Sequence, residues 1–273
     1  MTVQAYTMKS NLRLSAMVMV LLTASLSGCL GGDDGMPGEY TGPIDLVVYY
    51  DSTSGMVEES YNNGQAGPKT GVELSFDFAS TVSDDGDIVK IMLDPDDGSS
   101  PVEGNPSDDA TLSYTWLTHG LFFVTLSAED ENGNSHSIEV KIKIDMHIVW
   151  TDSNTQTASM QFNGESDCTD GDPYPDRITI SSTVENPDNG FFGGPSDVTW
   201  SLKNPESTEV ASQNGNIPEG SEETWDYTTR DVTPGMWTLT VEIGENSDSV
   251  NVNNDVTIAY AEGSESSVNP RPA

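Results

Sequence analysis

The clearest shortage in this chain of 273 residues is positive charge, because 10 Lys and Arg stand against 45 Asp and Glu and give a formal net charge of −35. A protein that binds nucleic acid needs a cationic surface that displaces the counterions of the phosphate backbone. Attraction to anionic lipid headgroups likewise requires clusters of Lys and Arg. The composition therefore excludes nucleic acid as a partner and argues against binding to lipid headgroups through charge.

Motifs of enzyme chemistry are also lacking. The three histidines, at positions 119, 136 and 147, do not form the His-Glu-x-x-His spacing of zinc enzymes, and there is no phosphate-binding loop. No Gly-x-Ser-x-Gly segment supplies the nucleophile of a hydrolase. With 45 carboxylates, pairs at glycosidase spacing arise by chance and carry no information. We therefore predict that the protein is not an enzyme.

The N-terminus has the order of a signal peptide. Residues 1–28 contain Lys9 and Arg13 but no acidic residue, and an apolar run over 14–26 is too short for a comfortable membrane span. The run ends in Leu26-Ser27-Gly28-Cys29, which resembles the lipobox of prokaryotic lipoproteins. The resemblance implies cleavage before Cys29 and a diacylglycerol on its thiol. The alternative is an uncleaved signal anchor, in which Cys29 is an ordinary small residue.

Residues 29–42 are rich in Gly and Asp and predict a flexible tether behind the lipidated Cys29. The segment around Cys29 and the acidic mature chain together resemble archaeal surface lipoproteins more than bacterial ones. This resemblance implies a protein held by lipid at the extracellular face of the cell membrane. Cys168 then has no intramolecular disulfide partner, and we interpret it as a buried spectator.

Beyond the tether, the pattern is that of strands. Short runs rich in β-branched and aromatic residues alternate with Gly, Asn, Asp and Pro clusters, as in β-sandwiches. The expected strands cover residues 44–50, 71–78, 88–93, 111–115, 121–129, 137–144, 159–162, 178–184, 198–202, 224–227, 237–243 and 250–259. Residues 51–56 are expected to form a turn. The sequence thus predicts an all-β protein with two Ig-like β-sandwich domains in tandem.

We place the first domain at residues 43–145, where several turns resemble the polycystic-kidney-disease (PKD) type of Ig-like module. The resemblance rests on 83–88 (Ser-Asp-Asp-Gly-Asp-Ile), 94–98 (Asp-Pro-Asp-Asp-Gly), 120–126 (Gly-Leu-Phe-Phe-Val-Thr-Leu) and 130–133 (Asp-Glu-Asn-Gly). It implies a β-sandwich that contacts protein or carbohydrate, or that spaces other modules.

The chain departs from that family pattern at three positions and continues into a second domain. Leu93, Pro95 and Asp96 replace a family Trp, Phe and Gly, and Trp116 stands where an aromatic residue is expected. A second sandwich, Ig-like or jelly-roll-like, is expected at residues 146–260, where the pattern restarts after Asp145. Residues 261–273 are polar and predict a disordered tail.

Acidic residues are concentrated in three turns of the first domain, and carboxylate oxygens in a turn can bind calcium. These residues are Asp84, Asp85 and Asp87, then Asp94, Asp96 and Asp97, and finally Asp130. None of the turns fits the EF-hand register. The alternative is that the carboxylates accept hydrogen bonds from the backbone N–H groups of their own turns.

Phe191 and Phe192 form an apolar pair inside a Gly-rich loop. They could be a binding tip, or they could fold back over the end of the sandwich. We expect a non-enzymatic, lipid-anchored surface protein that presents β-sandwich modules for protein or glycan binding or for spacing in the envelope. The alternatives are an accessory subunit of a membrane-bound enzyme or transporter, and a calcium-stabilised structural spacer.

Overall fold

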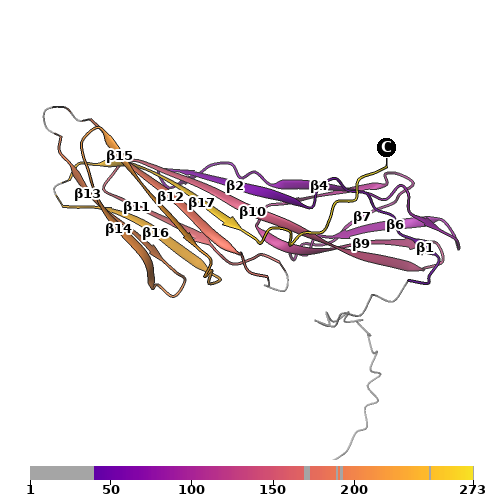
Figure 1. Cartoon of the computed structure of the whole chain (residues 1–273). Helices are drawn as coiled ribbons and strands as arrows, with labels where there is room; N and C mark the ends of the chain where they lie inside the picture. The colour runs from indigo at the N-terminus through magenta and orange to yellow at the C-terminus, as the bar shows by residue number, and fades with distance from the viewer. Residues whose placement is uncertain (1–39, 169–172, 189, 191–192, 246, 273) are drawn as a thin grey trace, which may run out of the picture. The chain divides into compact units, whose positions relative to one another are not determined.

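The computed structural model describes residues 40–168, 173–188, 190, 193–245 and 247–272. All named elements of this part are β-strands, and none of its residues is in an α-helix, which confirms the all-β prediction (Figure 1). No membrane-spanning helix is found in the same ranges. Cys29, Phe191 and Phe192 lie outside the described residues.

The strands fall before and after one long central strand, β10 (Ser135–Thr155). Before it come β1 (Ile44–Asp45), β2 (Ser54–Asn62), β3 (Gln65–Ala66), β4 (Val72–Asp77), β5 (Val82–Ser83), β6 (Ile88–Asp94), β7 (Val102–Gly104), β8 (Thr111–Trp116) and β9 (Gly120–Asp130). After it come β11 (Thr157–Asn163), β12 (Arg177–Asn186), β13 (Ser196–Lys203), β14 (Glu209–Ile217), β15 (Ser221–Thr229), β16 (Met236–Ile243) and β17 (Val250–Ala259).

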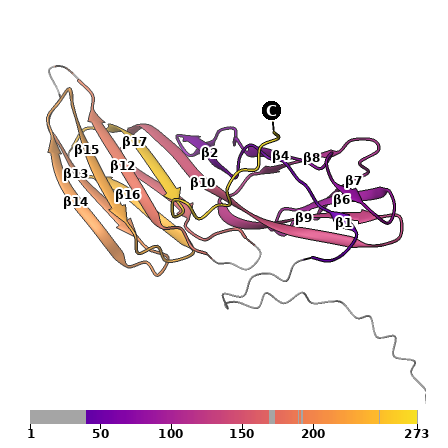
Figure 2. The ribbon, with the colours of Figure 1, turned by 45° about the vertical axis from the view of Figure 1, so that its right-hand side comes forward.

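Strand β10 belongs to both sandwiches (Figure 2). Its first half, up to Ile144, pairs with β9, and its second half, from Met146, pairs with β17. One large sheet therefore has the order β15-β12-β17-β10-β9-β6-β7. The short sheets β4-β8 and β1-β5 belong to the first half, and the sheet β11-β16-β13-β14 belongs to the second.

The boundary that we expected between residues 145 and 146 lies inside this strand. Ile142, Ile144, Met146 and Ile148 are all buried, so the alternation of apolar side chains continues through the boundary without a change of face. What looks like a restart in the sequence is the continuation of one strand from the first core into the second.

Strand β2 was not predicted. It pairs in parallel with the second half of β10, from Ser54 beside Lys143 to Asn62 beside Thr151. The turn expected over residues 51–56 is therefore wrong for its last three residues. The sequence concealed this strand because Val57 is its only fully buried residue. A glycine at position 55 allows β2 to lie close to β4, since a Cβ there would collide with the side chain of Val72.

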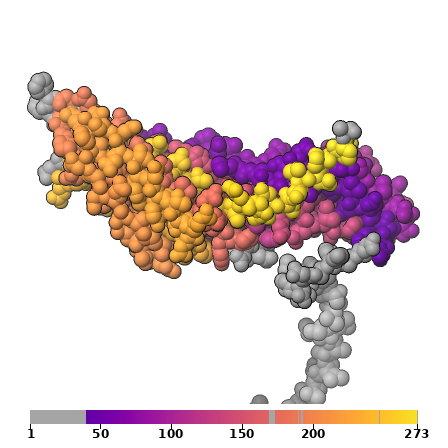
Figure 3. Space-filling view, in the orientation of Figure 1, coloured from indigo at the N-terminus to yellow at the C-terminus, as the bar shows by residue number. Residues whose placement is uncertain are grey.

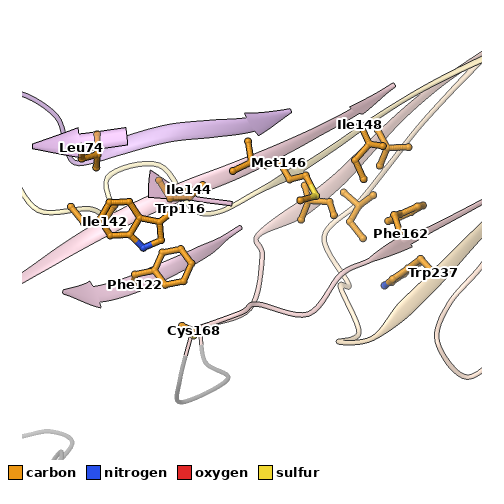
Figure 4. Packing of buried hydrophobic residues seen from close by; sticks show 14 of the residues in the cluster. Leu74, Trp116, Phe122, Ile142, Ile144, Met146, Ile148, Phe162, Cys168 and Trp237 are labelled. Carbon is orange, nitrogen blue, oxygen red and sulfur yellow. The ribbon is translucent and has the colours of Figure 1, made fainter. Parts of the chain in front are cut away.

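The buried side chains of the two sandwiches form one connected cluster (Figure 4). In the first sandwich, the ring of Trp116 lies 6.0 Å from that of Phe122, and both are fully buried. In the second, Phe162 stacks on Trp237 at 6.5 Å. Trp116 thus occupies the aromatic position that we expected from the sequence.

Residues 261–272 belong to the segment that we expected to form a disordered tail, and backbone hydrogen bonds join them to the first sandwich. The backbone of Asn269 exchanges two hydrogen bonds with that of Tyr50, at 2.8 and 3.1 Å. Ser266 N–H donates to the Lys141 carbonyl at 3.0 Å, and Arg271 pairs with Asp77. In Figure 3 this yellow segment crosses the indigo residues near the start of the domain. Backbone hydrogen bonds hold it, and a composition that is poor in apolar residues does not reveal them.

Candidate functional site

The structure brings two of the three acidic turns together around Asp130, which is 1% exposed. Ser83 Oγ–H donates to one carboxylate oxygen at 2.8 Å. The N–H groups of Asn132 and Asn134 donate to the other oxygen at 3.0 and 2.9 Å, and the Asn134 side chain also donates to the carboxylate. Burial would raise the pKa of Asp130, but the bonds from Asn134 and Ser83 outweigh it and hold the pKa below its ordinary value.

The residues of the first turn join this arrangement through both side chains and backbone. The Asn134 side chain donates to the Asp85 carboxylate at 3.2 Å, and the Asn132 side chain donates to the Asp85 carbonyl. The side chains of Asp84 and Asp87 are exposed. Because N–H and O–H groups from both turns donate to the carboxylate of Asp130, this carboxylate connects the first turn to the third.

The second turn holds its own carboxylates. Asp94 accepts from the Asp96 N–H at 3.2 Å, and Asp96 accepts from the Phe123 N–H at 2.8 Å. Asp96 has a φ of 62°, a left-handed conformation that non-glycine residues adopt rarely. Asp97 accepts from the Ser99 N–H at 2.9 Å. In the described ranges, no three His, Cys, Asp or Glu side chains gather as metal ligands would. These hydrogen bonds agree with the alternative to calcium binding, in which the carboxylates accept N–H groups and order their own turns. Calcium binding stays a prediction.

Tyr114 connects this second turn to a surface hollow of about 370 Å³. Its phenol O–H donates to the free oxygen of Asp97 at 2.5 Å and lies 2.9 Å from Ser99 Oγ. Its ring meets the edge of Trp116 at 4.9 Å. The hollow is lined by Asp97, Ser99, Tyr114, Leu117, Thr118 and Asp167. Leu117 is 51% exposed, so the hollow has an apolar patch in an otherwise polar wall.

Behind the hollow, His119 is buried where the two sandwiches meet. Its Nε2 lies 3.0 Å from the Asn163 carbonyl, and its Nδ1 lies 3.0 Å from the Tyr260 hydroxyl. A carbonyl can only accept, so Nε2 carries the hydrogen and Nδ1 accepts from Tyr260. Burial lowers the pKa of His119 and keeps the imidazole neutral. One ring thus joins the start of β9, the end of β11 and the residue after β17.

Cys168 lies beside this junction and is buried, as the spectator interpretation expected. Its Sγ is 3.2 Å from Ser166 Oγ. Burial raises the pKa of Tyr260, so its hydroxyl keeps its proton. Asp145, whose pKa burial also raises, accepts from the Tyr260 N–H at 2.9 Å. The polar groups at this junction therefore hydrogen-bond to one another and connect the strands that meet there.

Sequence reasoning selected Asp97 but missed the residues around it. Tyr114 and Leu117 carry no motif, and Asp167 is far from them in the chain. The available signal was the pair Tyr114 and Trp116 on one face of a strand, close to a family position rich in aromatic residues. The predicted lipidation site Cys29 and the predicted loop tip, Phe191 with Phe192, fall outside the described residues.

Comparison with known families then identifies part of the chain. Residues 63–142 match the PKD domain. The prediction of a PKD-like Ig-like domain is confirmed over this range, which begins after β2 and ends at Ile142, inside β10. Of the residues that line the hollow, all but Asp167 lie within the PKD match. No curated protein sequence matches the chain.

The chain is also similar to several solved structures, at low identity and low TM-score. One, from work on carbohydrate-binding modules of the β-sandwich superfamily, has 14% identity and a TM-score of 0.30, and the match covers 82% of this chain and 100% of that one. Another, from pili of Bacillus endospore appendages, has 18% identity and a TM-score of 0.24, with 43% and 86% covered. At such scores the similarities say nothing about a ligand.

Proposed function

We propose that this protein is a non-enzymatic, lipid-anchored protein of the extracellular cell surface, whose β-sandwiches present loops to an extracellular protein or glycan. The observation that supports this role best is the shared strand β10. Because β9, β17 and β2 all pair with it, the two sandwiches cannot separate without breaking a ladder of backbone hydrogen bonds. Such a construction suits a protein that holds its binding loops in fixed positions relative to one another.

The arrangement of titratable groups supports a role without catalysis. His119 is held between Tyr260 and Asn163, and Asp130 is enclosed by donors from its own turns. An enzyme needs an acid or base that can reach a substrate proton. Neither of these buried groups faces the solvent.

The lipid anchor rests on the order of residues from Lys9 to Cys29, and it can be tested in cells that process lipoproteins. We expect wild-type protein to partition into detergent and to be cleaved by protease added to intact cells. Cys29→Ser should move it to the aqueous phase, whereas the matched variant Cys168→Ser should partition as wild type does. Equal partitioning of the wild type and Cys29→Ser would overturn the lipid anchor.

The binding role is tested by crosslinking on the surface of intact cells, followed by mass spectrometry of what the anchored protein captures. One reproducible protein or glycan partner is the expected result. Loss of that partner on changing Phe191 and Phe192 to Ser would place the contact at the predicted loop tip. Capture of only abundant envelope components, unaffected by this change, would replace the binding role with a spacer role.

A further inference from the structure

The hollow beside Tyr114 is a built feature of the fold. Tyr114 is oriented by the Asp97 carboxylate, by Ser99 Oγ and by the edge of the buried Trp116 ring. The turn that carries Asp97 is itself fixed, because Trp116 Nε1–H donates to the Pro95 carbonyl at 3.3 Å. A ligand that binds here meets side chains that are already ordered, which lowers the entropic cost of binding.

The chemistry of the wall selects the kind of ligand. Asp97 and Asp167 accept hydrogen bonds, and the hydroxyls of Ser99 and Thr118 both donate and accept. Leu117, half exposed, supplies an apolar surface beside them. Groups that both donate and accept, arranged around an apolar C–H face, are those of a sugar ring. The volume of about 370 Å³ lies in the range of roughly 300–1,000 Å³ that small-molecule sites occupy.

The negative charge of the hollow narrows the choice of ligand class further. The charged groups in the wall are both carboxylates, and the whole chain carries a formal charge of −35. Uronic acids and sulfated sugars would be repelled by this field. A bare ammonium group offers only donors and would leave the hydroxyl donors and the leucine without matching partners.

We propose that this hollow binds a neutral sugar ring, with its hydroxyls on Asp97, Asp167 and Thr118 and its C–H face on Leu117. The proposal rests on the proposed function and names the ligand class and the site for it. It also assigns a role to the contact between sandwiches, because Asp167 comes from the loop after β11 and the other residues come from the PKD match.

The test is saturation-transfer NMR on the full mature chain in detergent, with maltose, cellobiose, mannobiose and diacetylchitobiose as neutral probes. Digalacturonate and spermidine serve as anionic and cationic probes. We expect at least one neutral disaccharide to bind. Asp97→Asn and Asp167→Asn should each weaken it about 10- to 100-fold, the loss expected for a hydrogen bond to a charged group. Asp108→Asn, in an exposed loop outside the hollow, should bind as wild type does.

If Asp97→Asn disturbs the turn, Tyr114→Phe provides the second test, because it keeps the ring and removes only the hydroxyl that orients Asp97. Neutral sugar binding that survives both Asp167→Asn and Tyr114→Phe unchanged would overturn the site. Binding of spermidine or digalacturonate alone would overturn the ligand class. If no probe binds while surface crosslinking still captures a partner, the sugar site fails and the proposed binding function stands.

Discussion

The buried His119 makes the stability of the protein depend on pH in a way that can be isolated. Burial lowers its pKa in the folded state, since a charged imidazole would lie away from water between Tyr260 and Asn163. The hydrogen bond to the Asn163 backbone, Asp167 and Asp145 act in the opposite direction, and Lys69 adds to the lowering. The unfolded chain restores the ordinary pKa of about 6.5.

The sign and size follow from proton linkage. Above pH 6.5 the ring is neutral in both states, so its contribution to stability is fully present there. As the pH falls below this value, the unfolded chain binds a proton that the folded chain does not, and stability is lost. One proton corresponds to at most about 1.4 kcal/mol per pH unit, so the loss at pH 5.5 is at most about 1.4 kcal/mol.

The assay is urea denaturation at pH 8, 7, 6.5, 6 and 5.5 for the wild type and for His119→Gln, which cannot be protonated. The 45 carboxylates and the other two histidines contribute to both proteins and cancel in the difference. We expect the stability advantage of the wild type to be constant above pH 7 and to shrink below 6.5. A difference that stays level down to pH 5.5 would show that the ring is protonated as easily in the folded state, and the reasoning from burial would be refuted.

Three further predictions concern the fold. Ile144→Ala, in the middle of β10, should cost about 2–5 kcal/mol and lower one common unfolding transition; two separate transitions in urea denaturation would contradict the shared strand. Ser182→Ala should cost about 1–3 kcal/mol, because the buried indole N–H of Trp200 donates to its hydroxyl at 2.9 Å, whereas Ser181→Ala, whose hydroxyl donates to the exposed Asp226, should cost little. Raising NaCl should raise the melting temperature by screening the charge of −35. Ca²⁺ and Mg²⁺ at equal ionic strength should act alike if the carboxylates only order their turns, so a larger effect of Ca²⁺ would support the predicted calcium sites.

Sequence reasoning succeeded for strands with one clearly buried face. β17 was predicted over residues 250–259, which are its bounds in the structure. β16 was predicted over residues 237–243 and begins one residue earlier, at Met236. β2 and β14 were not predicted at all. β14 has only Ile217 fully buried and includes Gly215, so its alternation is nearly invisible. Such strands form because their backbones pair with neighbouring strands, and the sequence of one strand does not reveal which strand it pairs with.

The candidate site was half predicted for the same reason. The sequence singled out Asp97 for its acidic turn, but its partner Tyr114 lies on another strand, and Asp167 reaches the hollow from the second sandwich. In the sequence, an Asp in a turn has the same appearance whether its carboxylate binds a metal, accepts from a backbone N–H or orients a phenol. Only the position of its second oxygen distinguishes these uses.

The pairing of Tyr50 with Asn269 has a consequence for how the protein is made. The partner of Tyr50 is Asn269, and the parallel partner of β2 is the second half of β10. Contacts between residues so far apart in sequence form slowly, since a long loop must close before they contribute. The first sandwich therefore cannot complete its edge until Asn269 has been synthesised and can reach Tyr50. For an exported protein, this segment must also pass through the membrane channel before the two residues can pair.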